Sequence, residues 1–108
     1  MSSLDPDKAP QFFDSMCKKN KVVIVSATYC SFCVKLKMML IEMGERFVTL
    51  EIDIIPNGRA LFAEVAQRTQ VHTVPQVFVK GKFIGGYDDM MALAQSGELK
   101  PMLDAAAK

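Results

Sequence analysis

The stretch Lys21-Val22-Val23-Ile24-Val25-Ser26 runs toward the motif Cys30-Ser31-Phe32-Cys33. The centre of the first stretch is a continuous β-branched run, which predicts a strand buried on both faces. We expect a helix to begin at about Cys30 and to continue to Met43, where Gly44 ends it. A buried strand that leads into a C-x-x-C pair at the start of a helix predicts an α/β fold in which the two thiols carry the chemistry.

Elements on either side complete the expected plan. Further helices are predicted at residues 11–19, 57–69, 90–95 and 98–107, and further strands at 47–52, 76–79 and 83–84. The last two strands are so close in sequence that they must form an antiparallel hairpin, whereas the first two, joined by a helix, should be parallel. Asp88 or Asp89 is expected to cap the helix at 90–95. The order predicts one domain over residues 1–108 with a thioredoxin-like fold, a four-stranded mixed sheet flanked by helices on both faces.

Composition limits the partners and the location that we expect. The 13 Lys and Arg residues and 12 Asp and Glu residues give a net charge of +1, which offers no electrostatic basis for binding nucleic acid or an anionic membrane. The longest apolar stretches, 22–25 and 38–41, are too short to span a bilayer. Because the first ten residues lack the basic and apolar regions of a targeting signal, the expected location is cytoplasmic.

The spacing of Cys30 and Cys33 predicts thiol–disulfide exchange. A Cys30 thiolate at a helix N-terminus would be stabilised by the helix dipole and by backbone N–H groups that have no intrahelical partner. Cys33 lies one turn further on, where it can reach the Cys30 sulfur but is less exposed to a substrate. We therefore expect Cys30 to attack a disulfide and Cys33 to resolve the mixed disulfide that forms.

Other interpretations of the cysteines stay open at this stage. Three cysteines cannot all pair within one chain, so a structural disulfide framework explains them poorly. A zinc site would need three or four protein ligands, and Cys17 and His72 are the only further candidates. The cysteines could also be small buried hydrophobic residues, which is the role that we expect for Cys17.

Pro75 precedes the strand predicted at 76–79. A cis bond before Pro75 would let the loop fold back beside the Cys30 sulfur, where its backbone could pair with an extended cysteinyl substrate. Base rates favour the alternative, an ordinary trans proline at the start of an edge strand.

Three motifs and the C-terminal region carry a resemblance to the glutaredoxins that covers nearly the whole chain. They are Thr28-Tyr29-Cys30-Ser31-Phe32-Cys33, Thr73-Val74-Pro75-Gln76-Val77-Phe78-Val79, Gly85-Gly86-Tyr87-Asp88-Asp89 and Gln95-Ser96-Gly97-Glu98-Leu99. The resemblance implies a cis Pro75 and glutathione as the reductant of disulfide or glutathionylated proteins. It also implies a glutathione groove in which the Val74 backbone pairs with the cysteinyl unit and Asp88 or Asp89 holds the γ-glutamyl end. The candidate binding residues are Tyr29, Phe32, Thr73, Val74, Pro75, Gly86, Tyr87, Asp88 and Asp89.

Some positions depart from the glutaredoxin pattern where the family addresses the glycine carboxylate of glutathione. A lysine is usual where this chain has Ala27, a glutamine is common at Phe62, and a basic residue usually stands at His72. A charge-assisted hydrogen bond contributes about 1.5–3 kcal/mol, so several such losses should weaken carboxylate binding unless Arg59 compensates. The losses would matter least for trypanothione, whose glycine carboxylates are amides, and trypanothione is therefore an alternative reductant.

Ser31 is a further departure, because many dithiol members have proline there. In the glutaredoxins that this chain resembles, serine at this position goes with a better ability to hold a [2Fe–2S] cluster, which would bridge two monomers through Cys30 and glutathione. Such a cluster needs four thiolates, which two copies of Cys30 and two glutathiones would supply. We expect a monomer, with a dimer only if the cluster is bound.

Overall fold

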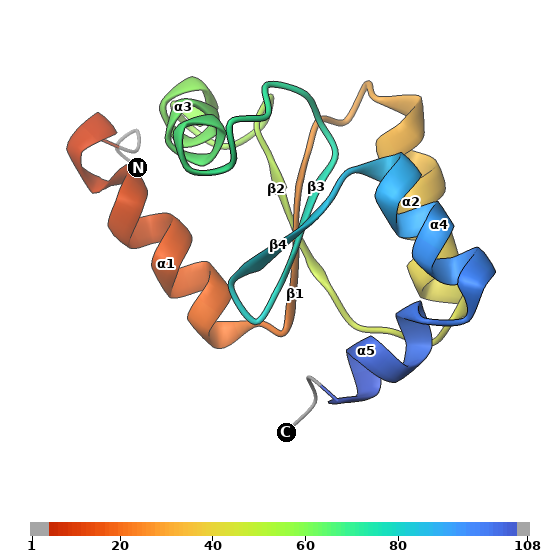
Figure 1. The fold of residues 1–108 in the computed structure, drawn as a ribbon. Coiled ribbons are helices and arrows are strands. Elements are labelled where there is room, and N and C mark those ends of the chain that lie inside the picture. Colours follow the sequence, from red (N-terminus) through yellow and green to blue (C-terminus); the bar gives the residue numbers. More distant parts are fainter. Residues whose placement is uncertain (1–4, 106–108) are drawn as a thin grey trace.

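A mixed sheet of four strands, ordered β2-β1-β3-β4, organises residues 5–105, the part of the chain that this computed structural model describes. The strands are β1 (Val22–Ser26), β2 (Val48–Glu51), β3 (Gln76–Val79) and β4 (Lys82–Gly85). A 3₁₀ turn η1 (Pro6–Lys8) precedes α1 (Ala9–Lys19), and the other helices are α2 (Ser31–Glu42), α3 (Gly58–Thr69), α4 (Tyr87–Ser96) and α5 (Leu99–Ala105). The thioredoxin-like plan predicted from the sequence is confirmed (Figure 1).

Strand β1 lies in the middle of this sheet and pairs on both sides. It runs parallel to β2, with Ser26 opposite Glu51, and antiparallel to β3, with Val22 opposite Val79. Strands β3 and β4 form the expected antiparallel hairpin. Helices α1 and α3 cover one face of the sheet, and α2, α4 and α5 cover the other (Figure 1).

Both faces of β1 are buried, as its unbroken β-branched run predicts. Val22 and Ile24 pack against the cluster formed by α2, α4 and α5, while Val23 and Val25 pack against the cluster formed by α1 and α3. Successive side chains of a strand point to opposite faces, so one short strand contributes to two hydrophobic cores. Within residues 5–105, no helix has the length and apolar character needed to cross a membrane.

The start of α4 differs from the sequence prediction. Neither Asp88 nor Asp89 is the N-cap residue; that residue is Gly86, and the helix begins at Tyr87 instead of Met90. The Asp89 carboxylate accepts a hydrogen bond from the Gly86 N–H at 3.1 Å. An acidic side chain at the third helical position often accepts a hydrogen bond from the N–H of the N-cap residue. In the sequence, an aspartate in this role looks the same as an aspartate at the N-cap position.

The other element bounds agree with the prediction to within two residues, except for the end of the last helix. Helix α1 begins two residues early because Pro10 occupies its first turn, where a missing N–H costs no intrahelical hydrogen bond. The C-terminal helix was expected to extend to residue 107, and its last residues lie outside the described part of the chain.

The central strand sets a prediction for stability. Ile24 is 0% exposed and Ile54, in the loop after β2, is 67% exposed. Ile24→Ala should lower the free energy of unfolding by about 2–5 kcal/mol, because it leaves a cavity between β1 and α2. Ile54→Ala removes the same atoms from an exposed position and should change that free energy by less than about 0.5 kcal/mol. Urea denaturation of both variants measures the difference, and equal effects would contradict this account of the core.

Candidate active site

The Cys30 sulfur caps helix α2. Cys30 has an extended backbone and occupies the N-cap position, and its Sγ accepts a hydrogen bond from the Cys33 N–H at 3.2 Å. A serine or aspartate oxygen fills this role in most helices. Here the free N–H of the first turn points at a sulfur, and a negative charge on that sulfur is stabilised by the N–H and by the helix dipole.

Cys33 differs from Cys30 in its access to solvent. Its side chain is 0% exposed, whereas that of Cys30 is half-buried. Burial raises the pKa of the Cys33 thiol, as does its contact with Cys30, while the backbone at Ala27 and the Ser26 hydroxyl lower it by smaller amounts. Cys33 is therefore a protonated thiol at neutral pH, reachable from Cys30 and shielded from a large substrate.

The loop before β3 lies against the Cys30 sulfur. The Val74–Pro75 peptide bond is cis, so the trans alternative is wrong. The Cys30 thiol donates to the Val74 carbonyl oxygen, with a sulfur–oxygen distance of 3.8 Å. Gly86 approaches the same loop closely, since a Cβ added there would lie 3.3 Å from the Pro75 carbonyl oxygen. Sequence segments more than 40 positions apart thus meet at one sulfur.

A groove of about 430 Å³ opens beside this loop. Its walls come from the start of α2, the loop before β3, strand β4 and the start of α4; they are Phe32, Val71, Thr73, Val74, Pro75, Phe83, Gly86, Tyr87, Asp88 and Asp89. Every predicted binding residue except Tyr29 lines it. Tyr29 is 77% exposed at the surface beside Cys30. Val71 and Phe83 were missed, because a lone valine and an aromatic residue within a predicted strand give no binding signal.

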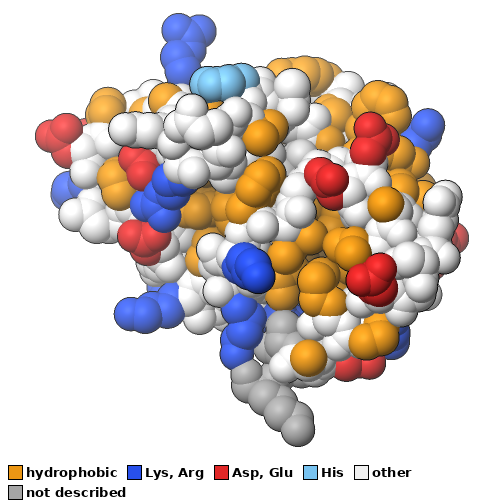
Figure 2. Space-filling view, in the orientation of Figure 1, with side chains coloured by type: hydrophobic (Ala, Val, Ile, Leu, Met, Phe, Trp, Pro, Cys, Tyr) orange, Lys and Arg blue, Asp and Glu red, His pale blue; other side chains and the backbone are white. Residues whose placement is uncertain are grey.

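Aromatic rings and carboxylates set the chemistry of the groove. The Phe32 and Tyr87 rings pack with centroids 5.0 Å apart, and the Lys35 ammonium lies 5.5 Å from the Phe32 centroid. Acidic side chains stand on the surface where α4 begins (Figure 2). Because the Asp89 carboxylate accepts from the Gly86 N–H, Asp88 is the carboxylate freer to meet a ligand. The groove therefore suits a ligand with a cationic group at this end.

A buried amide holds the loop in place. Gln76 is 0% exposed, and its Nε2 donates to the carbonyl oxygens of Val71 at 2.9 Å and Thr73 at 3.0 Å. Its Oε1 accepts from the Thr69 hydroxyl at 2.9 Å. Gln76 lies directly after Pro75 and so fixes the segment that faces Cys30. No role was predicted for Gln76 from the sequence, where its signal was a single polar residue at the head of an apolar strand.

Positions that could anchor a second carboxylate are mostly unsuited to the task. Ala27 is buried, and Phe62 packs into the core beneath α1 and α3. His72 and Arg59 are exposed, and within the described part of the chain neither forms an ion pair. None of the four lines the groove.

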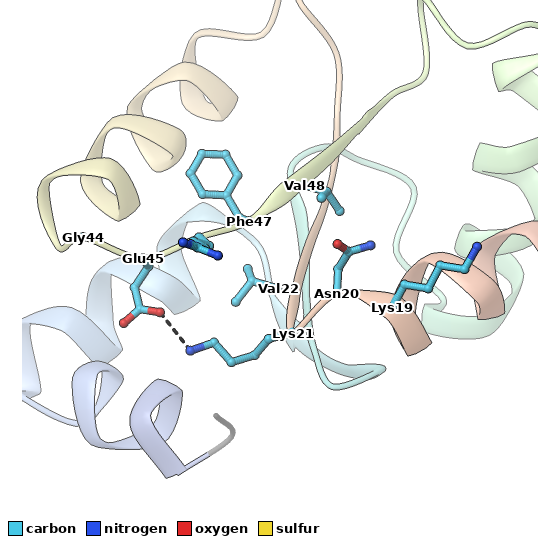
Figure 3. A pocket seen from close by; sticks show the side chains of 9 residues that line it. Lys19, Asn20, Lys21, Val22, Gly44, Glu45, Phe47 and Val48 are labelled. Atoms are coloured by element: carbon cyan, nitrogen blue, oxygen red, sulfur yellow. Dashed lines mark hydrogen bonds and ion pairs between the residues drawn. The ribbon is translucent and has the colours of Figure 1, made fainter. Parts of the chain in front are cut away.

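A larger cavity, of about 980 Å³, lies at the opposite end of the sheet (Figure 3). It is lined by the first residues of β1 and β2 and by the segments just before them, which include Lys21, Glu45 and Phe47, and it contains none of the predicted site residues. In residues 5–105, no group of three or more His, Cys, Asp or Glu side chains is placed to hold a metal ion. The described residues therefore offer no set of ligands for the zinc site considered above.

Comparisons with known proteins agree with this geometry. The Glutaredoxin family model matches residues 22–84. The chloroplastic glutaredoxin C4 of Oryza sativa subsp. japonica is 41% identical over 100 residues, which cover 93% of this chain and 72% of the rice protein. Buckwheat glutaredoxin, solved in complex with glutathione, has a TM-score of 0.90 at 36% identity, covering 94% of this chain and 93% of its own. A dithiolic glutaredoxin of Trypanosoma brucei brucei has a TM-score of 0.79 at 35% identity, covering 84% and 94%.

The role of Gln76 gives a second prediction. Gln76→Met keeps the size of the side chain but leaves the Val71 and Thr73 carbonyls without their donor, so the free energy of unfolding should fall by about 1–3 kcal/mol. Gln67→Met, on the exposed side of α3, is the matched control and should have little effect. Urea denaturation measures both variants. If the Gln76 variant were as stable as the control, the amide would not be holding the loop.

Proposed function

This chain belongs to the glutaredoxin family, and on that premise we propose that it is a glutathione-dependent thiol–disulfide oxidoreductase. Its proposed substrates are protein disulfides and the mixed disulfides that proteins form with glutathione. The observation that carries the proposal is the position of the Cys30 sulfur, which accepts the Cys33 N–H at 3.2 Å and lies 3.8 Å from the Val74 carbonyl oxygen, next to the groove.

Cys30 performs the first step in this proposal. Its thiolate attacks the glutathione sulfur of a glutathionylated protein, a bond forms between that sulfur and Cys30 Sγ, and the protein thiolate leaves and takes a proton from water. The Cys33 N–H and the dipole of α2 favour the attacking thiolate. The product is Cys30 in a mixed disulfide with glutathione.

Either of two thiols can complete the cycle. A second glutathione can attack the glutathione sulfur, which regenerates Cys30 and forms glutathione disulfide. Alternatively Cys33 attacks Cys30 Sγ, which releases glutathione and forms the Cys30–Cys33 disulfide. Two further glutathiones then reduce that disulfide and leave as glutathione disulfide, which completes the cycle by this route. Reduction of a protein disulfide uses the second route, because Cys33 must displace the target protein from Cys30.

The groove residues are proposed to hold glutathione. The backbone of Val74 would pair with the cysteinyl unit, in the manner of an added strand. The N-terminus of α4 suits the γ-glutamyl carboxylate, and Asp88 suits the γ-glutamyl ammonium. Phe32 and Tyr87 would contact the apolar part of the ligand, and Tyr29, exposed beside Cys30, is free to contact the protein substrate. Support comes from the buckwheat relative, which was solved with glutathione.

Trypanothione is the alternative reductant. Ala27 and Phe62 offer no charge for the glycine carboxylate of glutathione, and neither lines the groove. Trypanothione, whose glycine carboxylates are amides, does not need a positively charged side chain at these positions. We therefore propose glutathione as the reductant. Trypanothione becomes the better reductant if the chain leaves the glycine carboxylate of glutathione unbound.

A glutathione-ligated [2Fe–2S] cluster is the alternative function from a different class. Cys33 is fully buried, so Cys30 is the thiolate that this chain would offer, and its half-exposed position fits that role. Two copies of the chain and two glutathiones would complete the four ligands. Ser31 stands exposed at the first position of α2, next to Cys30.

The domain organisation, the oligomeric state and the partners are proposed as predicted from the sequence. We propose a single glutaredoxin domain over residues 1–108, monomeric unless a cluster joins two copies, with disulfide or glutathionylated proteins as partners. The cytoplasmic location stays a prediction, since the rice relative is named as chloroplastic.

Serine variants of the two active-site cysteines test the mechanism. Cys33→Ser should retain most of the activity toward a glutathionylated peptide, because that reaction needs only Cys30, and should lose nearly all activity toward a protein disulfide. Cys30→Ser should abolish both, whereas Cys17→Ser, the matched control on α1, should leave both unchanged. The assays follow release of the reduced peptide and reduction of the protein disulfide. Activity remaining in Cys30→Ser would refute the assignment.

A comparison of reductants tests the carboxylate argument. With glutathione as the reductant, kcat/KM for turnover of the glutathionylated peptide should be at least as high with glutathione as with trypanothione, and a clearly higher value with trypanothione would make trypanothione the reductant. Installing a lysine by His72→Lys should improve kcat/KM for glutathione but not for trypanothione, because only glutathione carries the free glycine carboxylate. A clear preference of the unmodified chain for glutathione would remove trypanothione from consideration.

A further inference from the structure

The large apolar side chains that are exposed to solvent gather around Cys30 and along helix α2. Within residues 5–105 these exposed side chains are Tyr29, Phe32, Val34, Met38, Ile41 and Ile54. Phe32 lines the groove, and three of the others lie further along α2. Exposed apolar side chains that are scattered singly are ordinary, whereas a group of them on one surface marks an interaction site.

Helix α2 is apolar on two sides. Its buried side carries Cys33, Leu36 and Leu40. The other side, which we call the outer face of α2, carries Val34 (45% exposed), Met38 (57%) and Ile41 (63%). Their spacing of four and three residues places these side chains on one face of the helix. A surface helix usually has polar residues on its solvent side, so an apolar outer face indicates a partner. Helix α2 lies on the outside of the molecule, beside α4 (Figure 1).

The outer face of α2 begins one helical turn after the residue whose sulfur is the proposed nucleophile. The Val34 N–H donates to the Cys30 carbonyl oxygen at 3.2 Å. At a rise of 1.5 Å per residue, the apolar face extends along the helix to about 16 Å from Cys30, at Ile41. A protein that is disulfide-bonded to Cys30 therefore has part of its own surface within reach of this face.

We propose that the outer face of α2 is the docking surface for the target protein, and that it binds an apolar segment beside the target's cysteine. This inference rests on the proposed function, which supplies the mixed disulfide between Cys30 and the target, and it adds which targets the chain prefers. Val34, Met38 and Ile41 do not line the groove proposed for glutathione. The target and glutathione would thus use separate surfaces on either side of the reacting sulfur.

Charged side chains border the outer face without interrupting it. Lys35 and Glu42 are exposed on α2, and in the described part of the chain neither forms an ion pair. An apolar centre with charges at its rim is the usual arrangement of a protein–protein interface. Lys35 stands at the Cys30 end, where its ammonium lies 5.5 Å from the Phe32 centroid. It therefore suits an acidic side chain close to the target's cysteine.

The size of the outer face favours a target protein over a second copy of this chain. A stable interface buries about 800 Å² per partner. Three half-exposed side chains offer only a few hundred square ångströms, which is too little to hold two copies together. A target that is tethered by a disulfide needs less contact, because the covalent bond keeps its local concentration high. The flexible Met38 side chain also adapts to partner surfaces of different shape.

Two synthetic peptides of about 16 residues provide the probe. Both have one cysteine with a glutamate beside it. The apolar peptide continues with three leucines at helical spacing, and the polar peptide has glutamines at the same positions. A chain with Cys17→Ser and Cys33→Ser keeps Cys30 as its single thiol, and we call it the parent chain.

The experiment is a competition for Cys30. The parent chain is equilibrated with both peptides at equal concentrations, each supplied as a mixture of its thiol and its disulfide. Cys30 attacks a peptide disulfide, one peptide stays on Cys30 Sγ, and the other leaves as a thiol. Acid then stops the exchange, and mass spectrometry measures the two adducts. The apolar adduct should exceed the polar adduct by at least about fivefold.

A variant of the outer face and a matched control locate the contact. Met38→Gln with Ile41→Gln, made in the parent chain, should lower the ratio of the two adducts to below about twofold, while glutamine preserves the helix. Ile54→Gln makes the same change at an equally exposed isoleucine in the loop after β2 and should keep the ratio of the parent chain. Because the readout is a ratio within one sample, a change in the reactivity of Cys30 does not affect it.

Four results would overturn the inference or its premise. Equal amounts of the two adducts on the parent chain would refute the docking surface, whereas no adduct with either peptide would refute the proposed function. An equal loss of preference in Ile54→Gln would refute the assignment to α2. In sedimentation equilibrium we expect the unmodified chain to be a monomer. A dimer that Met38→Gln with Ile41→Gln dissociates would assign the outer face to a second copy instead.

Discussion

The hydrogen bond from the Cys33 N–H to the Cys30 sulfur is the contact on which the rest of the site depends. It exists because β1 ends four residues before Cys30 and delivers the chain to the first turn of α2. Helix starts carry N–H groups that need an acceptor, and here the acceptor is the sulfur that we propose as the nucleophile. The same geometry places Cys33 on the buried side of α2. One helix start therefore places one thiol at the N-cap, where it accepts a backbone hydrogen bond, and buries the other.

The second half of the site is brought to that sulfur by the sheet. Strand β3 pairs with β1, so the loop before it reaches the end of β1 at which Cys30 stands. Gln76, at the head of β3, holds this loop by three hydrogen bonds from one buried side chain. The start of α4 closes the groove, with Gly86 against Pro75 and with Asp89 committed to the turn. The division of labour between Asp88 and Asp89 follows from that commitment.

The two ends of the parallel pair β1 and β2 carry similar ion pairs in different surroundings. Glu45 accepts from two lysines and needs no further partner, and its role is structural. Glu51 accepts from one lysine, Lys37 of α2, and within the described residues its other oxygen is buried without a hydrogen-bond partner.

The element order, the parallel and antiparallel pairings and the two thiols could be predicted from residue patterns, because a β-branched run, a C-x-x-C pair and a short hairpin are local signals. The cis bond before Pro75 came only from the resemblance. The cap of α4 was predicted wrongly, since an aspartate at the cap and one at the third helical position look alike in sequence. Val71 and Phe83 gave no local signal, and the signal of Gln76 was no more than a polar residue at the head of an apolar strand. Their roles depend on which backbone segments lie next to each other, and strand pairing between distant segments decides that.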